Sequence, residues 1–374
     1  MRKKVLVTGG AGFVGSHLVD ALVRDGEEVV VLDNLEYQVH EGRLPGYLNP
    51  GARYVFADVT DGEALERALE GCEVVFHEAA AVGVGQSMYQ VEKYMRVNAI
   101  GTAKLLDLLV NREHEVEKLV VASSMSIYGE GKYECADCGV VYPRLRPREQ
   151  LAARDWEVRC PTCGLALKPL PTDEGKPLFP TSIYAMSKRD QEEMSLAIGK
   201  AYGIPTVALR YFNIYGPRQA LSNPYTGVCA IFSCRIRNDN PPVIFEDGLQ
   251  SRDFVSVHDI VRANLLAMES SGADYKALNV GTGRPTSIRE IAEVLIRLYG
   301  KRLEPEVSNK YREGDIRHCY ADITAISALG FAPQVAFEEG MQELAEWVGL
   351  QPECQVADRF EKAQRELERR KLTL

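Results

Sequence analysis

The sequence has no long hydrophobic run. Its first apolar stretch, Val5-Leu6-Val7 behind a basic start, ends at Thr8-Gly9-Gly10, whereas a secretory signal needs about 7–15 apolar residues. Nowhere do the roughly 18 apolar residues of a membrane-spanning helix follow one another. We therefore expect a soluble, cytoplasmic protein that has no membrane partner.

Positive charge is also scarce. The chain has 44 Lys and Arg residues against 53 Asp and Glu residues, a formal net charge of -9. A protein that binds nucleic acid over its whole surface is normally basic, so this class is disfavoured. With 45% hydrophobic and 26% charged residues among 374, the composition is that of a globular protein with a sizeable core, in one large domain or two.

Nine cysteines are too few for a secreted disulfide framework in a chain of this length. Four of them form two Cys-x-x-Cys-Gly units, separated by 21 residues between Cys138 and Cys160. This spacing resembles a zinc ribbon or rubredoxin-like site, in which four thiolates hold Zn²⁺, with Fe as a substitute. A four-cysteine site is closed, so the predicted metal is structural; two disulfides or four free thiols are the alternative. The predicted ligands are Cys135, Cys138, Cys160 and Cys163, and the remaining cysteines are expected to be buried small apolar residues: Cys72, Cys229, Cys234, Cys319 and Cys354.

Short β-branched runs alternate with longer amphipathic runs over the first two hundred residues, which predicts a parallel sheet covered by helices on both faces. From Ile214 prolines interrupt this alternation, and we expect a smaller α/β substrate lobe there. The expected strands are Val5–Thr8, Val29–Leu32, Tyr54–Ala57, Val74–His77, Lys118–Ala122 and Thr206–Leu209. The expected helices are Phe13–Arg24, Tyr89–Val110, Ser182–Tyr202, Ile288–Leu298, Glu338–Val348 and a charged, solvated helix at Arg359–Lys371.

Three glycines follow the first expected strand, with the spacing Gly9-x-x-Gly12-x-x-Gly15. Such a loop provides a tight turn, close approach of backbone N–H groups to a pyrophosphate, and close packing of helix on strand. Asp33 ends the next strand, where a carboxylate accepts hydrogen bonds from a ribose diol and repels a 2′-phosphate, so NAD is favoured over NADP. Asp58, after the third strand, has two open interpretations, an adenine contact or a helix N-cap.

Two further features are expected at the carboxyl edge of the sheet. Ser124 lies directly after the strand ending at Ala122, and Tyr184 and Lys188 share one face of a helix because they are four residues apart. A nearby ammonium group favours the phenolate, so this pair is a candidate base near neutral pH. By contrast, His77 is expected to be a hydrogen-bonded structural histidine, and Glu78 a capping or exposed residue.

These motifs together resemble the extended short-chain dehydrogenase/reductase family, and within it the nucleotide-sugar epimerases and dehydratases. The resemblance continues through Arg210–Arg218, Ser251–Val255, Asn279–Gly281 and Arg312–Asp315. It implies a Rossmann-type doubly wound parallel sheet, a nucleoside diphosphate sugar between two lobes, and catalysis by Ser124, Tyr184 and Lys188. The implied NAD-binding residues are Gly9, Gly12, Phe13, Val14, Gly15, Asp33, Asn34, Asp58, Val59, Ala79, Asn98 and Lys188. The implied substrate residues are Gln86, Ser126, Asn213, Arg218, Arg252, Arg312 and Asp315.

The same resemblance implies the domain division. We expect an NAD-binding domain at 1–213, interrupted at 130–171 by the cysteine-bearing insertion. The substrate lobe follows at 214–350, with a part of it returning to the first domain, and a charged tail at 351–374. Relatives cross from the serine strand to the tyrosine helix in far fewer residues. The insertion is expected to border the sugar site or a subunit contact.

The serine segment also discriminates between reactions. Family members that eliminate water place Asp-Glu after the catalytic Ser or Thr, whereas Met125 and Ser126 stand here and cannot do that proton chemistry. The expected reaction is therefore epimerisation at carbon 4 through a transient 4-keto sugar, with hydride passing to NAD⁺ and back. Reduction of a keto sugar is the alternative. Segments 82–88 and 219–227 resemble the dTDP-L-rhamnose 4-epimerase type, which suggests a 6-deoxy sugar. The alternatives are a UDP-hexose, such as UDP-glucose or UDP-galactose, and a UDP-uronate.

The sequence also bears on two interactions with other macromolecules. By resemblance, the helices near Tyr89–Val110 and Ser182–Tyr202 are expected to pair in a homodimer. Zinc ribbons often bind nucleic acid, and this one has several arginines, but the acidic chain and the intact catalytic set argue against that class. The arginines concerned are Arg144, Arg146, Arg148, Arg154 and Arg159.

Overall fold

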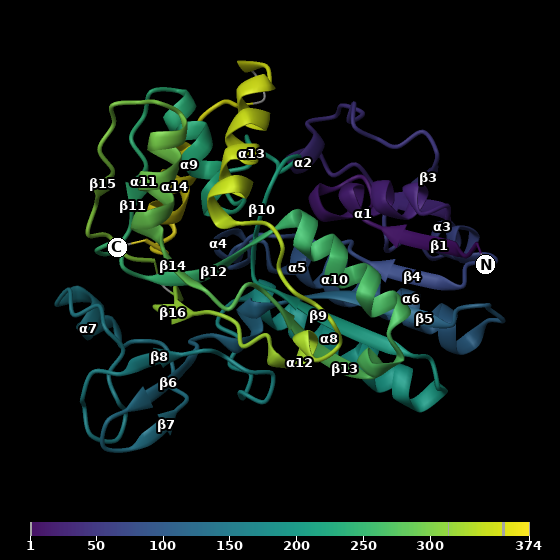
Figure 1. Cartoon of the computed structure of the whole chain (residues 1–374), viewed down its shortest axis with the longest axis horizontal. Helices are drawn as coiled ribbons and strands as arrows, with labels where there is room; N and C mark the ends of the chain where they lie inside the picture. The colour runs from purple at the N-terminus through teal and green to yellow at the C-terminus, as the bar shows by residue number, and fades with distance from the viewer. Residues whose placement is uncertain (1, 313, 354–355, 374) are drawn as a thin grey trace.

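The fold is described from a computed structural model, for residues 2–312, 314–353 and 356–373. A seven-stranded sheet forms its centre, and every strand pairs in parallel with its neighbours (Figure 1). The doubly wound sheet predicted from the sequence is confirmed. In spatial order its strands are β13 (Lys276–Val280), β9 (Thr206–Tyr211), β5 (Lys118–Ser124), β4 (Val74–His77), β1 (Lys4–Thr8), β2 (Glu28–Asp33) and β3 (Arg53–Phe56).

Alternate side chains of each strand enter two different cores. On one face, Val5 and Val7 of β1 pack with α1 (Phe13–Arg24) and α10 (Val257–Glu269). On the other face, Leu6 packs with α3 (Gly62–Leu69) and α6 (Gly101–Asn111), and the long helix α8 (Ile183–Tyr202) completes this layer. Both faces of the strands are buried, which explains why the strands appear in the sequence as continuous apolar runs.

A second lobe is built from the residues beyond Tyr211, although β13 from this region joins the main sheet. Its helices pack around a separate core that includes Phe232, Leu295 and Leu344. The helices are α9 (Val228–Arg237), α11 (Ile288–Leu298) and α13 (Phe337–Leu350). Its strands are β10 (Asn213–Tyr215), β12 (Ser251–Ser256), β14 (Pro285–Ser287) and β16 (His318–Cys319), with a separate pair β11 (Val243–Ile244) and β15 (Glu306–Val307).

The insertion forms a small antiparallel sheet of three strands at the lower left of Figure 1. In spatial order the strands are β7 (Gly139–Val141), β6 (Lys132–Cys135) and β8 (Lys168–Leu170). The short helix α7 (Arg148–Ala152) lies between β7 and β8 in the chain. Its core is small, comprising Tyr133, Val158 and Leu167 together with Cys135 and Cys160. A core of this size gives little stability by itself.

Two helices differ from the sequence prediction. The expected helix at Tyr89–Val110 is divided into α5 (Val91–Tyr94), a π-helical turn η1 (Met95–Ile100) and α6, and such turns are frequent at functional sites. The tail helix α14 (Phe360–Arg369) was expected to be solvated, which is wrong: Phe360, Ala363 and Leu367 are buried on one face. Its many charges obscured this apolar stripe. The shorter helical segments are α2 (Tyr37–His40), α4 (Val84–Ser87), η2 (Met125–Tyr128), η3 (Ser271–Ala273) and α12 (Thr324–Ser327).

Among the described residues, no helix is both long and apolar enough to cross a membrane. Four of the five cysteines predicted to be small core residues are buried, namely Cys72, Cys229, Cys234 and Cys319. Cys354 lies outside the described residues, as does Glu313 of the Arg312–Asp315 motif.

Candidate active site at the carboxyl edge of the sheet

The glycine loop packs too closely for larger residues. A Cβ atom on Gly15 would lie 2.2 Å from Gly9 O, and Gly9 has φ +72°, with Ala79 N 2.8 Å from its Cβ position. No side chain caps α1 at Gly12, so its first N–H groups, from Phe13 and Val14 onward, provide a site for an anion. Across the loop, Asp33 is buried and accepts hydrogen bonds from Ala11 N at 3.0 Å and Leu35 N at 2.8 Å. This cradle fits the pyrophosphate and ribose of a dinucleotide.

We expect Gly15→Ala to abolish dinucleotide binding, because the methyl group would displace the Gly9 carbonyl and open the loop. The matched control is Gly46→Ala, since no atom lies within 4 Å of the added Cβ and the φ of Gly46 is not positive. Release of the nucleotide from denatured protein and its quantification by chromatography measure the difference. An NAD content of Gly15→Ala equal to that of the control contradicts this assignment.

Asp58 and its neighbours line the same edge. Asp58 accepts hydrogen bonds from Thr60 N and Oγ1 at 2.9 and 2.6 Å and from Asn34 Nδ2 at 2.9 Å. The N-cap of α3 is Asp61, so the interpretation of Asp58 as that cap is wrong. Val59 is buried, and its side chain fills the space where Gly101 has no Cβ.

Ser124, Tyr184 and Lys188 come together where β5 ends beside α8. Ser124 Oγ accepts hydrogen bonds from Ser126 N at 3.2 Å and Ser126 Oγ at 2.9 Å, which leaves the Ser124 hydroxyl proton to donate elsewhere. Lys188 Nζ donates to Ala122 O at 2.7 Å and Gln191 Oε1 at 2.9 Å, so two of its three protons are directed by the fold.

Burial is the largest influence on the pKa values of Tyr184 and Lys188. It raises the pKa of Tyr184, whereas the hydrogen bond with Ser124 lowers it. It lowers the pKa of Lys188 to about 8, whereas the charge of Glu78 raises it. The Tyr184 ring packs edge-on against Tyr94, with ring centroids 6.4 Å apart. Burial therefore favours the neutral phenol of Tyr184 and the neutral amine of Lys188, so positive charge brought beside them would be needed to favour the phenolate.

Asn98 lies in the π-helical turn and joins two parts of this site. Its Oδ1 accepts from Ala81 N at 2.7 Å, and its Nδ2 donates to Ala81 O at 3.1 Å and Ser187 Oγ at 2.9 Å. The predicted structural role of His77 agrees with the geometry: the ring is buried between the hydroxyls of Thr8 and Thr102, 2.8 and 2.9 Å away, and burial lowers its pKa to about 3.

Glu78 was missed as a site residue, and its assignment as a capping or exposed residue is wrong. Its carboxylate accepts a hydrogen bond from Tyr211 Oη at 2.7 Å, and Tyr211 in turn meets Asn264. Burial raises the pKa of Glu78 to about 7, while Tyr211 and Lys188 act in the opposite direction. The sequence did contain a signal for a site residue here: Glu78 directly follows a buried strand, at the edge of the sheet where the glycine loop also lies.

The second lobe brings Arg252, Arg312 and Asp315 together. Burial raises the pKa of Asp315, and the charges of Arg312 and Arg252 oppose this shift. The Arg312 guanidinium lies 4.2 Å over the Phe245 ring, and its buried Nε has no hydrogen-bond partner among the described residues. Asn213, at the start of β10, likewise has a buried Oδ1 for which the described part of the chain offers no partner. Two guanidinium groups beside unpartnered polar atoms can bind an anion such as a phosphate.

Two predicted substrate residues lie elsewhere in the fold. Arg218 forms an ion pair with Asp20 of α1 at 2.7 Å and lies over the Tyr47 ring at 5.0 Å. Tyr47 donates to Ala11 O at 3.1 Å, so Arg218 borders the glycine loop rather than the Arg252 cluster. Gln86 Oε1 accepts hydrogen bonds from Tyr94 Oη at 3.1 Å and Gln38 Nε2 at 3.0 Å, on the Tyr184 side.

The four cysteine sulfurs of the insertion lie within 4.8 Å of one another. The pair Cys135 and Cys163 is 3.4 Å apart. Four sulfurs around one Zn²⁺ at about 2.3 Å are roughly 3.8 Å apart in a tetrahedron, so the cluster has the size that a metal requires.

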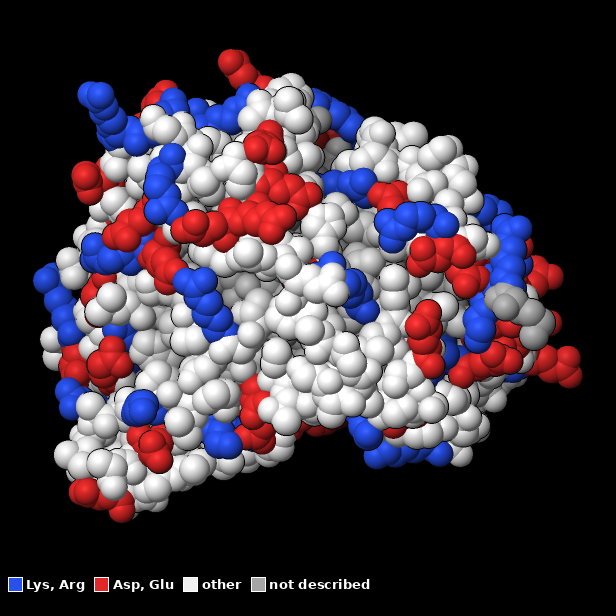
Figure 2. All heavy atoms as spheres, viewed as in Figure 1, with Lys and Arg blue, Asp and Glu red and all other residues white. Residues whose placement is uncertain are grey.

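Three of the five arginines that made the insertion look basic are held by other side chains of the protein. Arg146 is buried against Glu246, Arg159 pairs with Asp155, and Arg144 lies over the Phe179 ring. In Figure 2 the few charged side chains over the insertion are of both signs.

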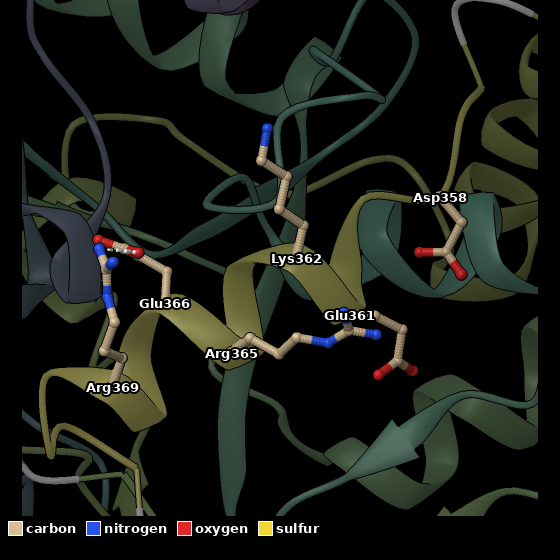
Figure 3. Close-up of a pocket in the computed structure, with 6 residues that line it drawn as sticks. All are labelled: Asp358, Glu361, Lys362, Arg365, Glu366 and Arg369. Atoms are coloured by element: carbon tan, nitrogen blue, oxygen red, sulfur yellow. Dashed lines mark hydrogen bonds and ion pairs between the residues drawn. The ribbon is translucent and has the colours of Figure 1, made fainter.

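A depression along α14 also has a charged lining (Figure 3). Its lining includes neither Ser124 nor Tyr184 nor Lys188, and consists of Asp358, Glu361, Lys362, Arg365, Glu366 and Arg369.

Comparison with known proteins agrees with this geometry. The chain matches the NAD dependent epimerase/dehydratase family over residues 5–152 and 164–281. It is 37% identical to dTDP-L-rhamnose 4-epimerase of Burkholderia thailandensis over 92% of this chain and 95% of that protein. It superposes on UDP-glucose 4-epimerase of Thermotoga maritima with UDP-glucose (TM-score 0.73, 33% identity, 92% and 98% of the two chains). The UDP-glucose 4-epimerase of Thermus thermophilus with NAD is similar (TM-score 0.72, 31% identity, 93% and 100%). The chain therefore belongs to the NAD-dependent epimerase/dehydratase family.

Proposed function

We propose that this protein is an NAD-dependent 4-epimerase of a nucleoside diphosphate hexose. The observation that carries the proposal is the grouping of Ser124, Tyr184 and Lys188 at the carboxyl edge of the sheet, without an acidic residue beside Ser124. Met125, where dehydratases need an acid, packs in a small core with Tyr128 and Phe212. The named relatives point the same way, since 4-epimerases of dTDP-L-rhamnose and UDP-glucose are among them.

The residues divide the chemistry between them. The loop of Gly9, Gly12 and Gly15 and the Asp33 carboxylate hold NAD⁺, which when bound supplies a reversible hydride acceptor for carbon 4. Tyr184 removes the proton of the hydroxyl on that carbon and later returns it. Ser124 donates a hydrogen bond to the reacting oxygen in both stages, and the Lys188 ammonium stabilises the phenolate.

Arg252 and Arg312 would bind the diphosphate of the substrate. The Nη atoms of Arg252 already donate to the carbonyls of Ser251, Ile316 and Arg317, so its Nε and one Nη2 proton remain for phosphate oxygens. Asn213, Ser126 and Gln86 are the proposed sugar contacts, with Asp315 orienting the arginines. Arg218, beside the glycine loop, would act on the cofactor side. The first-named relative favours a dTDP-linked 6-deoxy sugar such as dTDP-L-rhamnose, and a UDP-hexose is the second candidate.

The test is incubation of candidate dTDP- and UDP-hexoses with the purified protein and no added cofactor, with epimers separated by chromatography. Interconversion without added nucleotide supports the proposal. A requirement for stoichiometric NADH or NADPH would instead establish a keto-sugar reductase and contradict it.

A pH profile tests Lys188 and Glu78 together. Lys188, with a pKa of about 8, loses its proton as pH rises through this value, so activity should fall on the alkaline side. Glu78→Gln removes the charge that raises the pKa of Lys188, so this alkaline limb of kcat/KM should move to lower pH. Glu78→Asp keeps the charge and should keep the limb near its wild-type position. An unmoved limb in Glu78→Gln contradicts the coupling.

We also propose that the four cysteines hold one structural Zn²⁺, with Fe as a substitute, in the reducing environment of the cytoplasm.

A homodimer is the proposed assembly. It is supported by exposed apolar side chains on the expected dimer helices, including Val91 (46% exposed), Ile100 (50%) and Met186 (39%). Sedimentation velocity measures this state directly.

A further inference from the structure

Residues 311–312 and 314–318, here called the clamp segment, lie beside the arginine cluster. The segment carries Arg312 and Asp315 itself. It also directs Arg252, whose Nη1 donates to Arg317 O at 2.9 Å and whose Nη2 donates to Ile316 O at 2.6 Å. The carbonyls of Ile316 and Arg317 therefore direct the Arg252 guanidinium, and Arg312 belongs to the same segment.

Arg146 of the insertion meets the clamp segment inside the protein. Its side chain is 1% exposed and donates to both carboxylate oxygens of Glu246, at 2.9 and 2.8 Å. The same guanidinium donates to Asp315 O at 3.2 Å and to Trp156 O at 2.8 Å. One buried arginine thus links the insertion, the second lobe and the backbone of Asp315.

Arg317 makes the reciprocal connection from the clamp segment to the insertion. Its side chain is fully buried and pairs with Glu157 of the insertion at 2.6 Å and with Asp247 at 2.7 Å. Its backbone N donates to Glu130 Oε1 at 2.7 Å, and His318 N donates to Tyr133 Oη at 3.1 Å. Buried ion pairs of this kind hold one geometry, because the loss of any partner leaves a charge unpaired.

An apolar contact stands beside this ionic network. Tyr311, the residue before Arg312, packs in a small cluster with Leu151 and Trp156 of the insertion. The rings of Trp156 and Tyr311 are 6.3 Å apart at 59°. Both ends of the clamp segment are therefore anchored in the insertion, by an aromatic contact at Tyr311 and by ion pairs at Arg317.

We propose that the cysteine-bearing insertion is the support of the substrate-binding arginines, with Arg146 and Trp156 as positioning residues that orient Arg252 and Arg312 toward a nucleoside diphosphate. The inference rests on the proposed function for the identity of the ligand. It gives the insertion a task in substrate affinity, whereas the proton chemistry at Tyr184 lies outside its contacts.

The experiment uses the full-length, NAD-loaded protein and compares Arg146→Gln and Trp156→Ala with Arg148→Gln. Arg148 is an exposed arginine two residues from Arg146, so the control carries the same chemical change. Calorimetry with UDP and with dTDP gives the dissociation constants, and epimerisation gives KM and kcat. We expect Arg146→Gln and Trp156→Ala to raise Kd and KM by at least about tenfold while kcat stays within about threefold.

The outcomes separate the two proposals. A wild-type protein that binds neither diphosphate contradicts the proposed function. A wild-type protein that binds one of them, with Arg146→Gln and Trp156→Ala binding as tightly as Arg148→Gln, contradicts only this inference. Variants that lose kcat and Tm together at unchanged KM also overturn it, because that pattern describes general destabilisation. Trp156→Ala removes no charge and keeps the backbone oxygen that accepts from Arg146, so it keeps the test decisive if Arg146→Gln fails to fold.

Discussion

Tyr184→Phe is expected to lower kcat by about 10²- to 10⁴-fold, the usual contribution of a positioned general base, equivalent to roughly 3–5 kcal/mol of transition-state stabilisation. In the proposed step the Tyr184 phenolate takes the proton of the sugar hydroxyl and becomes the phenol, since Ser124 is a neutral donor there and Lys188 donates to Ala122 O and Gln191 Oε1. The ring and its edge-on contact with Tyr94 remain in the variant. Folding and NAD content should therefore stay at the wild-type level.

Tyr94→Phe is the matched control for this prediction. It removes a hydroxyl from the adjacent ring, together with the hydrogen bond to Gln86 Oε1 at 3.1 Å, and leaves Tyr184 intact. We expect it to change kcat by less than about tenfold, because Tyr94 has no part in proton transfer. If Tyr184→Phe retains activity comparable to Tyr94→Phe, another group is the base and the proposed mechanism is wrong.

The parts of this site that lie close together in the sequence could be predicted from it. Gly9, Gly12 and Gly15 occupy one turn, and Tyr184 and Lys188 one helical face, so local geometry determines their arrangement. The central sheet was predictable for a similar reason: strands buried on both faces appear as continuous apolar runs. The cysteines were recognisable because a metal ligand knuckle has a fixed short spacing.

The parts that depend on long-range contacts could not be predicted. Glu78 meets Tyr211, 133 positions further along the chain, and Arg146 meets Glu246, 100 positions away. Nothing near Arg146 in the sequence distinguishes it from the exposed Arg148. The insertion therefore looked basic, although its central arginine is neutralised inside the protein. The tail helix α14 was predicted to be solvated because its charged residues outnumber its three apolar residues at helical spacing, which are the ones that are buried.

Removal of the metal is expected to unfold the insertion while the NAD-binding sheet remains folded. Its own core consists of five buried residues, of which Cys135 and Cys160 are themselves proposed ligands. Zinc binding to four thiolates provides an apparent free energy of about 10–16 kcal/mol at neutral pH, far more than such a core can give. Protein purified with its metal should contain about one Zn²⁺ or Fe ion per chain, measured by plasma mass spectrometry.

Cys138→Ser is the substitution that tests this most cleanly, because Cys138 is exposed and makes no other contribution to the core. We expect the variant to lose its metal and to be cleaved within residues 130–171 by dilute protease, while NAD stays bound at the distant glycine loop. Cys72→Ala is the control, because Cys72 is buried in the core between the main sheet and helices α3 and α6. This variant should keep the metal and resist cleavage. If the support of the clamp segment depends on the folded insertion, the same Cys138→Ser protein should also bind UDP or dTDP more weakly than Cys72→Ala. A Cys138→Ser protein that keeps full metal content and protease resistance would falsify the four-cysteine site.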